Sequence, residues 1–339
     1  MFIHRRLASV VEKQEQAGMS YTLVATAKNE GPYLLEWVAY HRAIGFDNIL
    51  IFQNDSTDYT HEILRVLDEL GIVSYRYNKA VRGRHQVRAY KRAARQDSFR
   101  NSDWAIALDL DEFLQIHAGD GHLDDLFAAL PEVDEVLLNW RRFGNDGNTQ
   151  LLPGLVTERF QKAEPDERVT TRLTPYKAMF RPTHFHQCGV HRPNGLLVPE
   201  EGIRTCNGSG LMLDEFERLR FRATDPAGRR LAQINHYIVR DAASFVLKSD
   251  RGSAHQADRG IDKMYWKRRN FNDERDDSLA KRSDEIIAAM ADLNQLSAGR
   301  LNHLRDKALS RHLDRFSELL DVPVYKELFE FCAGDRKAA

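Results

Sequence analysis

The order of predicted strands and helices in the first 110 residues constrains the fold of this 339-residue chain most strongly. Apolar runs at 21–27, 48–52, 72–77 and 104–108 have the length of buried strands, and segments with helical spacing separate them. A β-α-β-α-β-α-β order predicts a parallel, doubly wound α/β sheet. Such sheets bind ligands at the carboxyl ends of their strands, and the polar clusters of this sequence lie at those ends.

The rest of the chain is less regular. A polar stretch at 157–174 is expected to be a loop, and helical periodicity predominates from residue 242 onward. We therefore expect an N-terminal helical extension at 1–19, an α/β domain at 20–240 and a C-terminal helical region at 241–339. The other predicted elements are a helix at 123–130, strands at 135–140, 177–181 and 231–240, and helices at 242–251, 258–270, 283–296 and 301–320.

The composition argues against several classes of protein. Lys and Arg total 49 against 50 Asp and Glu, a net charge of −1, so no charge excess indicates a nucleic-acid partner. Three cysteines, far apart and odd in number, indicate free thiols in a reducing compartment. No apolar run approaches the roughly 18 residues of a membrane span, and the N-terminus lacks the apolar core of a signal peptide. We expect a cytoplasmic protein, with peripheral attachment to the inner face of a membrane left open.

The strand at 104–108 leads directly into two carboxylates spaced i, i+2, Asp109 and Asp111. If the extended backbone continues through Asp111, both side chains point to one side of the sheet. Converging carboxylates repel each other unless a cation lies between them, and Mg²⁺ and Mn²⁺ prefer oxygen ligands. The pattern indicates a metal–diphosphate site, and a solvated turn is the alternative for an isolated Asp-x-Asp.

Six motifs follow one another between about residues 20 and 255. They are Lys28-Asn29-Glu30, Glu36-Trp37-x-x-Tyr40-His41, Asn54-Asp55-Ser56-Thr57-Asp58, Asp109-Leu-Asp111-Glu112-Phe113, Trp140-x-x-Phe143-Gly144, and His236-Tyr237 with Lys248-x-x-Arg251-Gly252. In kind and order they resemble family 2-like glycosyltransferases, in the branch that includes family 92, formerly domain of unknown function 23. The resemblance implies the glycosyltransferase-A fold, a nucleotide-binding α/β domain that transfers sugar from a nucleotide-sugar with a divalent metal.

A nucleotide-sugar donor needs contacts for its base, its ribose and its diphosphate. Asp55, at the end of the second strand, can accept hydrogen bonds from a uracil or ribose. The alternative for this motif is a helix N-cap formed by Ser56, Thr57 or Asp58. The motif at 54–58 departs from the family pattern, because most relatives have an extra glycine in it. At the end of the first strand, the backbone groups of Thr26, Ala27 and Lys28 are expected to face the base. Asn29 and Glu30 are then expected close to the ribose or sugar.

Basic residues are candidates for the diphosphate. Arg84 lies at the start of a basic helix, where backbone amides favour phosphate. Lys248 and Arg251 could close over the diphosphate, or they could pair with Asp250 and Asp258.

The resemblance assigns the metal, Mn²⁺ or Mg²⁺, to Asp109 and Asp111. The cation would neutralise the charge that builds on the leaving diphosphate. His236 ends a later strand, and the fold commonly uses imidazole as a further ligand. The alternative is a core histidine held by hydrogen bonds.

The segment His184-Phe-His-Gln-Cys188 could place His184, His186 and Cys188 on one strand face, with His191 nearby. Such ligands suit Zn²⁺. The spacing differs from that of common paired-ligand loops, so we favour a structural or acceptor-lining role.

Inverting transfer needs a general base that deprotonates the acceptor hydroxyl. Asp146, in the turn after the strand at 135–140, is the first candidate because its loop should border the acceptor site. Glu112 and Glu201 compete with it.

The sequence and the resemblance thus predict a metal-dependent glycosyltransferase that uses a nucleotide-diphospho-sugar, with a UDP-sugar as the favoured donor. The predicted acceptor is a glycan or lipid-linked saccharide, and the C-terminal helices could shape the acceptor site, a homodimer contact or a membrane-surface face. Three alternative functions are a nucleotidyltransferase, an inactive scaffold of the same fold and a zinc hydrolase. A nucleotidyltransferase usually has a glycine-rich phosphate loop after its first strand, and Lys28-Asn-Glu-Gly has one glycine, which argues against this class.

Overall fold

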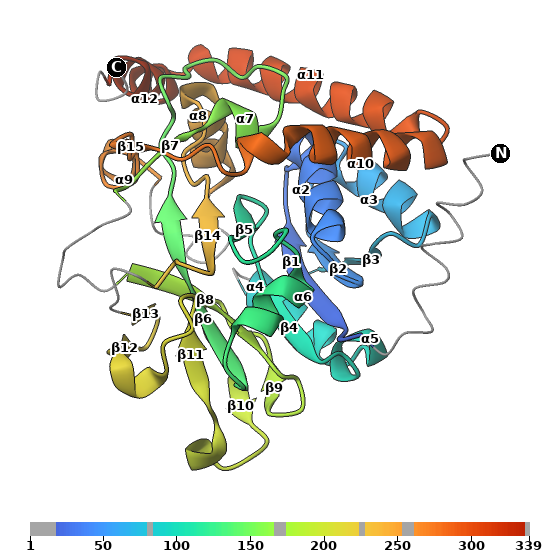
Figure 1. Ribbon diagram of the computed structural model, residues 1–339. Helices are drawn as coiled ribbons and strands as arrows, with labels where there is room; N and C mark the ends of the chain where they lie inside the picture. Colours follow the sequence, from blue (N-terminus) through green and yellow to red (C-terminus); the bar gives the residue numbers. More distant parts are fainter. Residues whose placement is uncertain (1–17, 80–83, 166–173, 224–227, 253–260, 336–339) are drawn as a thin grey trace.

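The four apolar runs of the first 110 residues form neighbouring parallel strands in the computed structural model (Figure 1). The sheet order β3-β2-β1-β4 places a topological switch point between β1 and β4, where α/β sheets bind ligands. The structure describes residues 18–79, 84–165, 174–223, 228–252 and 261–335. The four strands are β1 (Tyr21–Ala27), β2 (Asn48–Gln53), β3 (Ser74–Tyr77) and β4 (Trp104–Ala107).

Helices cover both faces of these strands. Leu23 and Ile49 pack in one core cluster with α2 and α3, whereas Val24 and Leu50 pack in a second with α4 and α5. The predicted doubly wound α/β arrangement is therefore confirmed, although the basic helix predicted to start near Arg84 is followed by a second short helix before β4. The four helices are α2 (Gly31–Ala43), α3 (Thr60–Glu69), α4 (His85–Ala93) and α5 (Asp97–Arg100).

Four strands extend the sheet beyond β4, in the order β8, β6, β14 and β5. β8 is antiparallel to β4 and β6, β14 is parallel to β6, and β5 is antiparallel to β14. The sequence predicted three of them and missed β5, because it begins only five positions after β4 ends and the two appear as one apolar segment. They are β5 (Glu112–Ile116), β6 (Glu135–Arg142), β8 (Thr174–Phe180) and β14 (Ala232–His236).

Shorter elements complete the α/β part. The predicted loop at 157–174 contains the end of α7 and the short β7, and its residues 166–173 lie outside the described residues. The short elements are α6 (Leu123–Ala129), α7 (Val156–Arg159), β7 (Lys162–Ala163), β9 (Phe185–Gln187), β10 (Asn194–Leu196), β11 (Thr205–Asn207), β12 (Arg218–Leu219), β13 (Arg222–Ala223) and β15 (Glu274–Arg275).

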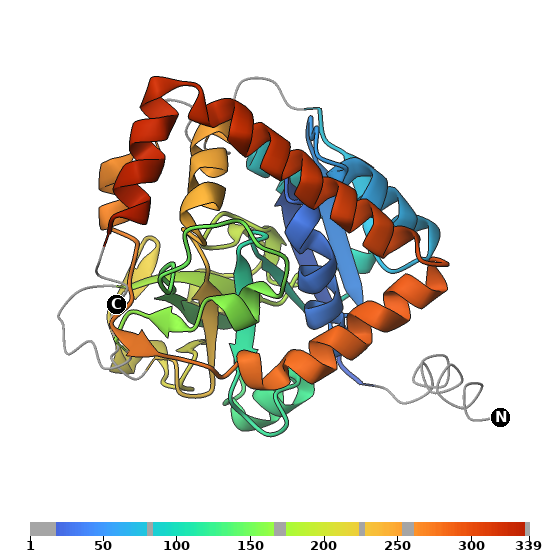
Figure 2. The same cartoon turned by 90° about the horizontal axis from the view of Figure 1, so that it is seen from above.

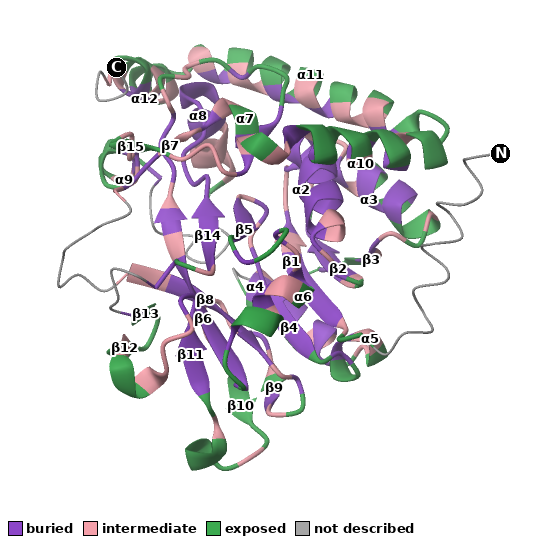
Figure 3. Ribbon diagram, in the orientation of Figure 1, coloured by how far each residue is buried: buried purple, intermediate pink, exposed green. Residues whose placement is uncertain are grey.

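The C-terminal region is helical, as predicted. α10 and α11 lie across α2, and α11 also contacts α3 and α8 (Figure 2). Their outer faces are exposed, whereas Ala308 and His312 of α11 are buried against the α/β part (Figure 3). In the described part of the chain no helix is long and apolar enough to cross a membrane. The helices are α8 (Ala242–Arg251), α9 (Lys263–Lys267), α10 (Ser283–Leu296), α11 (Arg300–Leu320) and α12 (Pro323–Ala333).

Two expectations for helices change with the structure. The predicted helix at 258–270 is limited to the five-residue α9 within the described residues, and α12 was not predicted. The helix expected in the extension at 1–19 falls on residues 1–17, which lie outside the described residues.

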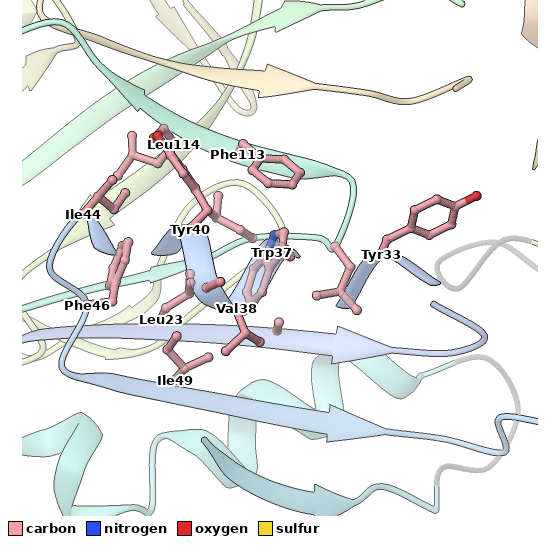
Figure 4. Close-up of a cluster of buried hydrophobic side chains, with 14 of the residues drawn as sticks. Leu23, Tyr33, Trp37, Val38, Tyr40, Ile44, Phe46, Ile49, Phe113 and Leu114 are labelled. Carbon is pink, nitrogen blue, oxygen red and sulfur yellow. The ribbon is translucent and has the colours of Figure 1, made fainter. Parts of the chain in front are cut away.

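The Glu36-Trp37-x-x-Tyr40-His41 motif positions β5 (Figure 4). The Trp37 indole donates to the carbonyl of Glu112 at 2.8 Å, and the Tyr40 hydroxyl donates to that of Leu114 at 2.6 Å. Burial lowers the pKa of His41 to about 3, so the ring is neutral and packs with Phe113. This helix therefore fixes the strand that carries Glu112 into the site.

Glu36 is a buried carboxyl whose ionisation opposes folding. It accepts hydrogen bonds from the backbone amides of Val156 and Thr157 and from the Thr157 hydroxyl, yet burial raises its pKa to about 7. A carboxyl with a raised pKa binds its proton more tightly in the folded state, so its contribution to stability is lost as pH rises from about 4.5 to 7.

We therefore expect the free energy of unfolding of the wild type, minus that of Glu36→Gln, to fall across this pH range. The slope should reach at most about 1.4 kcal/mol per pH unit. Urea unfolding of both proteins at several pH values measures the difference. A difference that stays constant with pH would show that Glu36 ionises as readily in the folded protein as in the unfolded chain.

Candidate functional site

Polar residues from four strands meet at the carboxyl edge of the parallel half of the sheet. Asn29 follows β1, Asp55 follows β2, Asn78 follows β3 and Asp109 follows β4. The parallel registers of β1 with β2 and β4, and of β2 with β3, bring these strand ends together. The fold thus brings together the strand ends at which the site is predicted.

The loops after β1 and β2 are joined by side-chain hydrogen bonds. The Asn29 amide donates to the Ser56 hydroxyl at 3.0 Å, and the Thr57 amide donates to the Asn29 side-chain oxygen at 2.8 Å. Asn29 and Asp55 both have left-handed backbone conformations, with φ of 51° and 48°. Of the three residues proposed to cap the next helix, Ser56 and Thr57 do not do so, since α3 begins at Thr60 without a side-chain cap from either. Asp58 does contact the start of α3, because its Oδ1 accepts from the Thr60 amide at 3.2 Å.

Asp55 faces residues from β3 and α4. Its Oδ1 accepts a hydrogen bond from the Tyr77 hydroxyl at 2.6 Å. His85, the first residue of α4, interacts electrostatically with both Lys28 and Asp55, and burial lowers its pKa. These residues form a polar group next to the end of β1. Arg84 precedes α4 and is exposed at this rim.

Thr26 and Ala27 are the last two residues of β1, as the predicted strand at 21–27 placed them. Their backbones pair with Phe52 and Gln53 of β2, and the Ala27 carbonyl also accepts from the Asn54 amide at 3.1 Å. The backbone of this pair is therefore engaged in the sheet.

Glu30 is held by two arginines at the start of α2. Arg240 Nη1 lies 3.0 Å from Glu30 Oε2, and Arg251 Nη1 bonds Glu30 Oε1. Arg251 also donates to the carbonyl of Lys28 at 2.7 Å. Burial would raise the pKa of Glu30, but Arg251 and Arg240 outweigh it and lower the pKa. The resemblance predicted Glu30 and Arg251 in the same site, and the structure brings them into contact.

Arg240 was not predicted from the sequence. It follows β14 with a left-handed φ of 53° and lies with its guanidinium carbon 3.7 Å from the centre of the Tyr33 ring. It donates to the carbonyl of Leu110, between the two aspartates, at 3.2 Å. It lies between His236-Tyr237 and Lys248 in the sequence, but no local pattern marks a lone arginine at the end of a strand.

The two aspartates do not continue β4. The strand ends at Ala107, and Leu110 and Asp111 form a turn, so the condition for both side chains to share one side of the sheet is not met. Asp109 Oδ1 accepts from the Gln86 side chain at 2.8 Å.

All four carboxylate oxygens of this pair have a partner of their own. Asp109 Oδ2 lies 3.1 Å from Lys177 Nζ, and Asp111 Oδ2 lies 2.8 Å from Lys248 Nζ. Asp111 Oδ1 lies 3.5 Å from His236 Nε2. Burial would raise the pKa of Asp111, but Lys248 and His236 hold it well below its usual range.

Lys177, on β8, is a second residue that the sequence did not reveal. Its side chain is 1% exposed, and its Nζ lies 3.1 Å from both Asp109 and Glu112. Burial raises the pKa of Glu112 to about 8, in spite of Lys177. The lysine was concealed because the predicted strand at 177–181 placed it among apolar residues with no motif around it.

His236 lies among these groups. It pairs with Glu112 across β14 and β5, and its ring is 4.3 Å from that of Trp140. Burial lowers its pKa, and its Nδ1 has no hydrogen-bond partner among the described residues. The structure thus brings His236 to the aspartates, as the motif order predicted.

The residues present do not fit a bound divalent metal as they are placed. In the described part of the chain, no group of three or more His, Cys, Asp or Glu side chains could hold a metal ion. Lysine ammonium groups lie on both Asp109 and Asp111, where the metal was expected. The assignment of Mn²⁺ or Mg²⁺ to these two residues and His236 stays a prediction.

A cavity of about 340 Å³ adjoins this cluster. One wall comes from the loop after β1 and from Asp111, and the other comes from α8 and α11. The C-terminal helices therefore contribute directly to the site. Its charged lining includes Glu30, Asp111, Arg240, Lys248, Arg251 and Arg315.

Two groups of predicted residues lie elsewhere. Asp146 does not line the cavity, and its Oδ2 accepts from the Gln161 amide at 3.0 Å. The expectation that His184, His186 and Cys188 share one face is wrong, because Cys188 is buried and His186 is exposed. His191 lies near the site, with its ring 5.4 Å from that of Trp140.

Comparisons with known proteins agree with the motifs. The family model for glycosyltransferase family 92 matches residues 26–211, more than half of the chain, and the chain belongs to this family. A glycosyltransferase family 92 protein of rice, Oryza sativa subsp. japonica, is 25% identical over 194 residues. The match covers 55% of this chain and 31% of the rice protein's length.

Solved structures resemble the chain more distantly. Staphylococcus aureus TarS 1–349 in complex with UDP has 14% identity and a TM-score of 0.33, over 49% of this chain and 47% of TarS 1–349. Mycobacterium tuberculosis glucosyl-3-phosphoglycerate synthase, in complex with Mn²⁺, UDP and glucosyl-3-phosphoglycerate, has 17% identity and a TM-score of 0.25. That match covers 37% of this chain and 45% of the synthase.

Proposed function

We propose that this protein transfers a sugar from a UDP-sugar to a hydroxyl of a glycan or lipid-linked saccharide, with inversion. The acceptor oxygen forms a bond to the anomeric carbon, the bond from that carbon to the diphosphate breaks, and UDP leaves. The observation that carries the proposal is the meeting of Asn29, Asp55 and the cations Lys248 and Arg251 at the carboxyl edge of the sheet, in a member of a glycosyltransferase family.

The polar group at Asp55 suits a base and ribose. Asp55 offers carboxylate oxygens to the N–H and O–H donors of uracil or ribose, and the Tyr77 hydroxyl fixes one of them. Lys28 and Asn29 are held beside it by Arg251 and Ser56. A positioned acceptor and a fixed backbone loop are what recognition of a uracil requires.

A row of four aromatic rings is the feature that suggests where the acceptor saccharide binds. His236, Trp140, His191 and Phe221 follow one another with centroid distances of 4.3, 5.4 and 5.5 Å. The row begins beside Asp111 and ends at Phe221, which is 39% exposed. Aromatic faces with polar edges bind the apolar faces and hydroxyls of sugars, so we propose that the acceptor saccharide lies along this row.

For the general base we propose Asp146, with Glu112 as the competitor. Asp146 lies in the turn after β6, the strand that carries Trp140, and its side chain is 22% exposed. We expect Asp146→Asn to retain UDP binding and to lower transfer about 10²-fold or more, since general-base catalysis contributes that much. Initial rates and a UDP titration measure both effects. Full activity in Asp146→Asn, together with loss of transfer in Glu112→Gln, would assign the base to Glu112.

Calorimetric titration with UDP, GDP and CDP tests the donor assignment. UDP should bind and the other two should bind more weakly, since we propose that Asp55 accepts a hydrogen bond from the uracil base. Failure of all three to bind would favour the rival, an inactive scaffold of the same fold. Turnover of a nucleoside triphosphate with a sugar phosphate, without transfer to a saccharide, would favour a nucleotidyltransferase.

The proposal also covers the domain boundaries, the cellular compartment and the contacts of the C-terminal helices. We propose that the division at residues 20 and 241 marks the α/β domain, that the protein acts in a reducing compartment at or near the inner face of a membrane, and that the C-terminal helices serve a homodimer or membrane contact. The exposed outer faces of α10 and α11 are the surfaces available for such contacts.

A further inference from the structure

The cluster beside the cavity carries an excess of positive charge. Glu30 is shared by Arg240 and Arg251, and Asp111 is paired with Lys248. Three cations therefore face two carboxylates, and the side chains of all five are at most 20% exposed. Buried charge is stable only when it is paired, so a cluster with one surplus cation is suited to an anion.

The cations also keep hydrogen-bond donors in reserve. Lys248 Nζ has three N–H donors, of which one goes to Asp111 and one to the carbonyl of Ile238 at 2.7 Å. Arg240 is 8% exposed, and its Nε has no hydrogen-bond partner among the described residues. All three cations line the cavity of about 340 Å³, within the range of small-ligand sites.

A divalent cation at Asp111 would compete with these groups. It would have to displace Lys248 from Asp111 Oδ2 and would add two positive charges beside Arg240 and Arg251. Arg240, Lys248 and Arg251 can instead neutralise the negative charge of a diphosphate. These side chains are already in place, so they need no reorganisation when charge develops on the leaving group.

We infer that Arg240, Lys248 and Arg251 form the binding site for the donor's diphosphate, and that they bind it without a divalent metal. The inference rests on the proposed function, because it assigns the diphosphate of a UDP-sugar donor. It differs from the expectation drawn from Asp109 and Asp111, in which a metal neutralises the diphosphate.

The test compares UDP with uridine by calorimetry, in EDTA and in Mn²⁺, on the full chain. In EDTA, UDP should bind at least about tenfold more tightly than uridine, and Mn²⁺ should change the affinity for UDP by less than about tenfold. These wild-type measurements do not depend on whether a variant folds.

Variants then identify the cations. Lys248→Met should weaken UDP binding in EDTA by about tenfold or more and leave uridine binding unchanged. Arg300→Gln on α11 is the matched control, because it removes one positive charge from an exposed pair with Glu69 and should alter neither. Thermal unfolding checks that each variant is folded.

The outcomes separate the two proposals. Tighter binding of UDP than of uridine only in Mn²⁺ would overturn the inference and leave the proposed function standing. Unchanged UDP affinity in folded Lys248→Met would also overturn the inference. If neither UDP nor uridine binds under any condition, the proposed function itself fails.

Discussion

Glu30→Gln is expected to lower the free energy of unfolding by about 3 kcal/mol or more. Removing one partner of a buried ion pair costs about 3–5 kcal/mol, because the other charge is left without compensation. Here the change leaves two guanidiniums, those of Arg240 and Arg251, beside a neutral amide. Urea unfolding at neutral pH measures the loss.

The pH dependence of the loss in unfolding free energy provides a second test of the role of Glu30. The pKa of Glu30 is lowered in the folded state, so its contribution is present above its ordinary value near 4.5 and is lost as pH falls through the lowered value. Glu30→Gln should therefore destabilise the protein less in acid than at neutral pH. Glu327→Gln is the control, since Glu327 is 68% exposed in its pair with Lys263 and should change stability by at most about 1 kcal/mol. An equally small effect at Glu30 would show that water compensates the two arginines.

Local patterns predicted the parallel half of the fold because each strand and helix there has its own period. The runs that became β1, β2 and β4 are continuous, apolar and bounded by turn residues, which is typical of buried parallel strands. The same logic placed Asn29, Asp55 and Asp109 at one edge, since parallel strands end together. Predicting that these residues lie at one edge of the sheet required no information on how side chains pack.

The orientation of the side chains could not be read from the sequence. The spacing of Asp109 and Asp111 implied convergence only for an extended backbone, and the turn at Leu110 removes that condition. The lysines that meet these aspartates come from β8 and α8, which are 68 and 137 positions away. No local period reports a contact between elements so far apart, so the ion pairs of Asp109 and Asp111 with these lysines appear only in three dimensions.

Motif residues proved to have structural as well as chemical roles. Trp37 and Tyr40 looked like family signatures without a physical task, and the structure shows that they hold β5 in register through its carbonyls. β5 in turn carries Glu112 to His236. The antiparallel strand was missed because its length and apolar character matched a continuation of β4, and only the contact with α2 distinguishes the two.

Lys177→Met is expected to weaken UDP binding in EDTA by about tenfold or more. Lys177 Nζ neutralises Asp109 at the edge where the donor is proposed to bind, and burial keeps Glu112 largely protonated at neutral pH because its pKa is about 8. Without the lysine, the Asp109 carboxylate repels the diphosphate, and one such repulsion of about 1.4 kcal/mol accounts for a tenfold loss. Calorimetric titration with UDP and uridine measures the change, and uridine should be unaffected.

The double variant Lys177→Met/Asp109→Asn distinguishes this account from a metal site. If Lys177 acts by neutralising Asp109, removal of both charges should restore UDP binding to near the wild-type value, and the two substitutions should not be additive. If Asp109 instead binds a metal that holds the diphosphate, Asp109→Asn alone should abolish binding in Mn²⁺ and the double variant should recover none of it. Asp109 is 33% exposed but Lys177 is 1% exposed, so thermal unfolding must first show that each variant is folded; the UDP affinities of the folded variants then report on charge at the site.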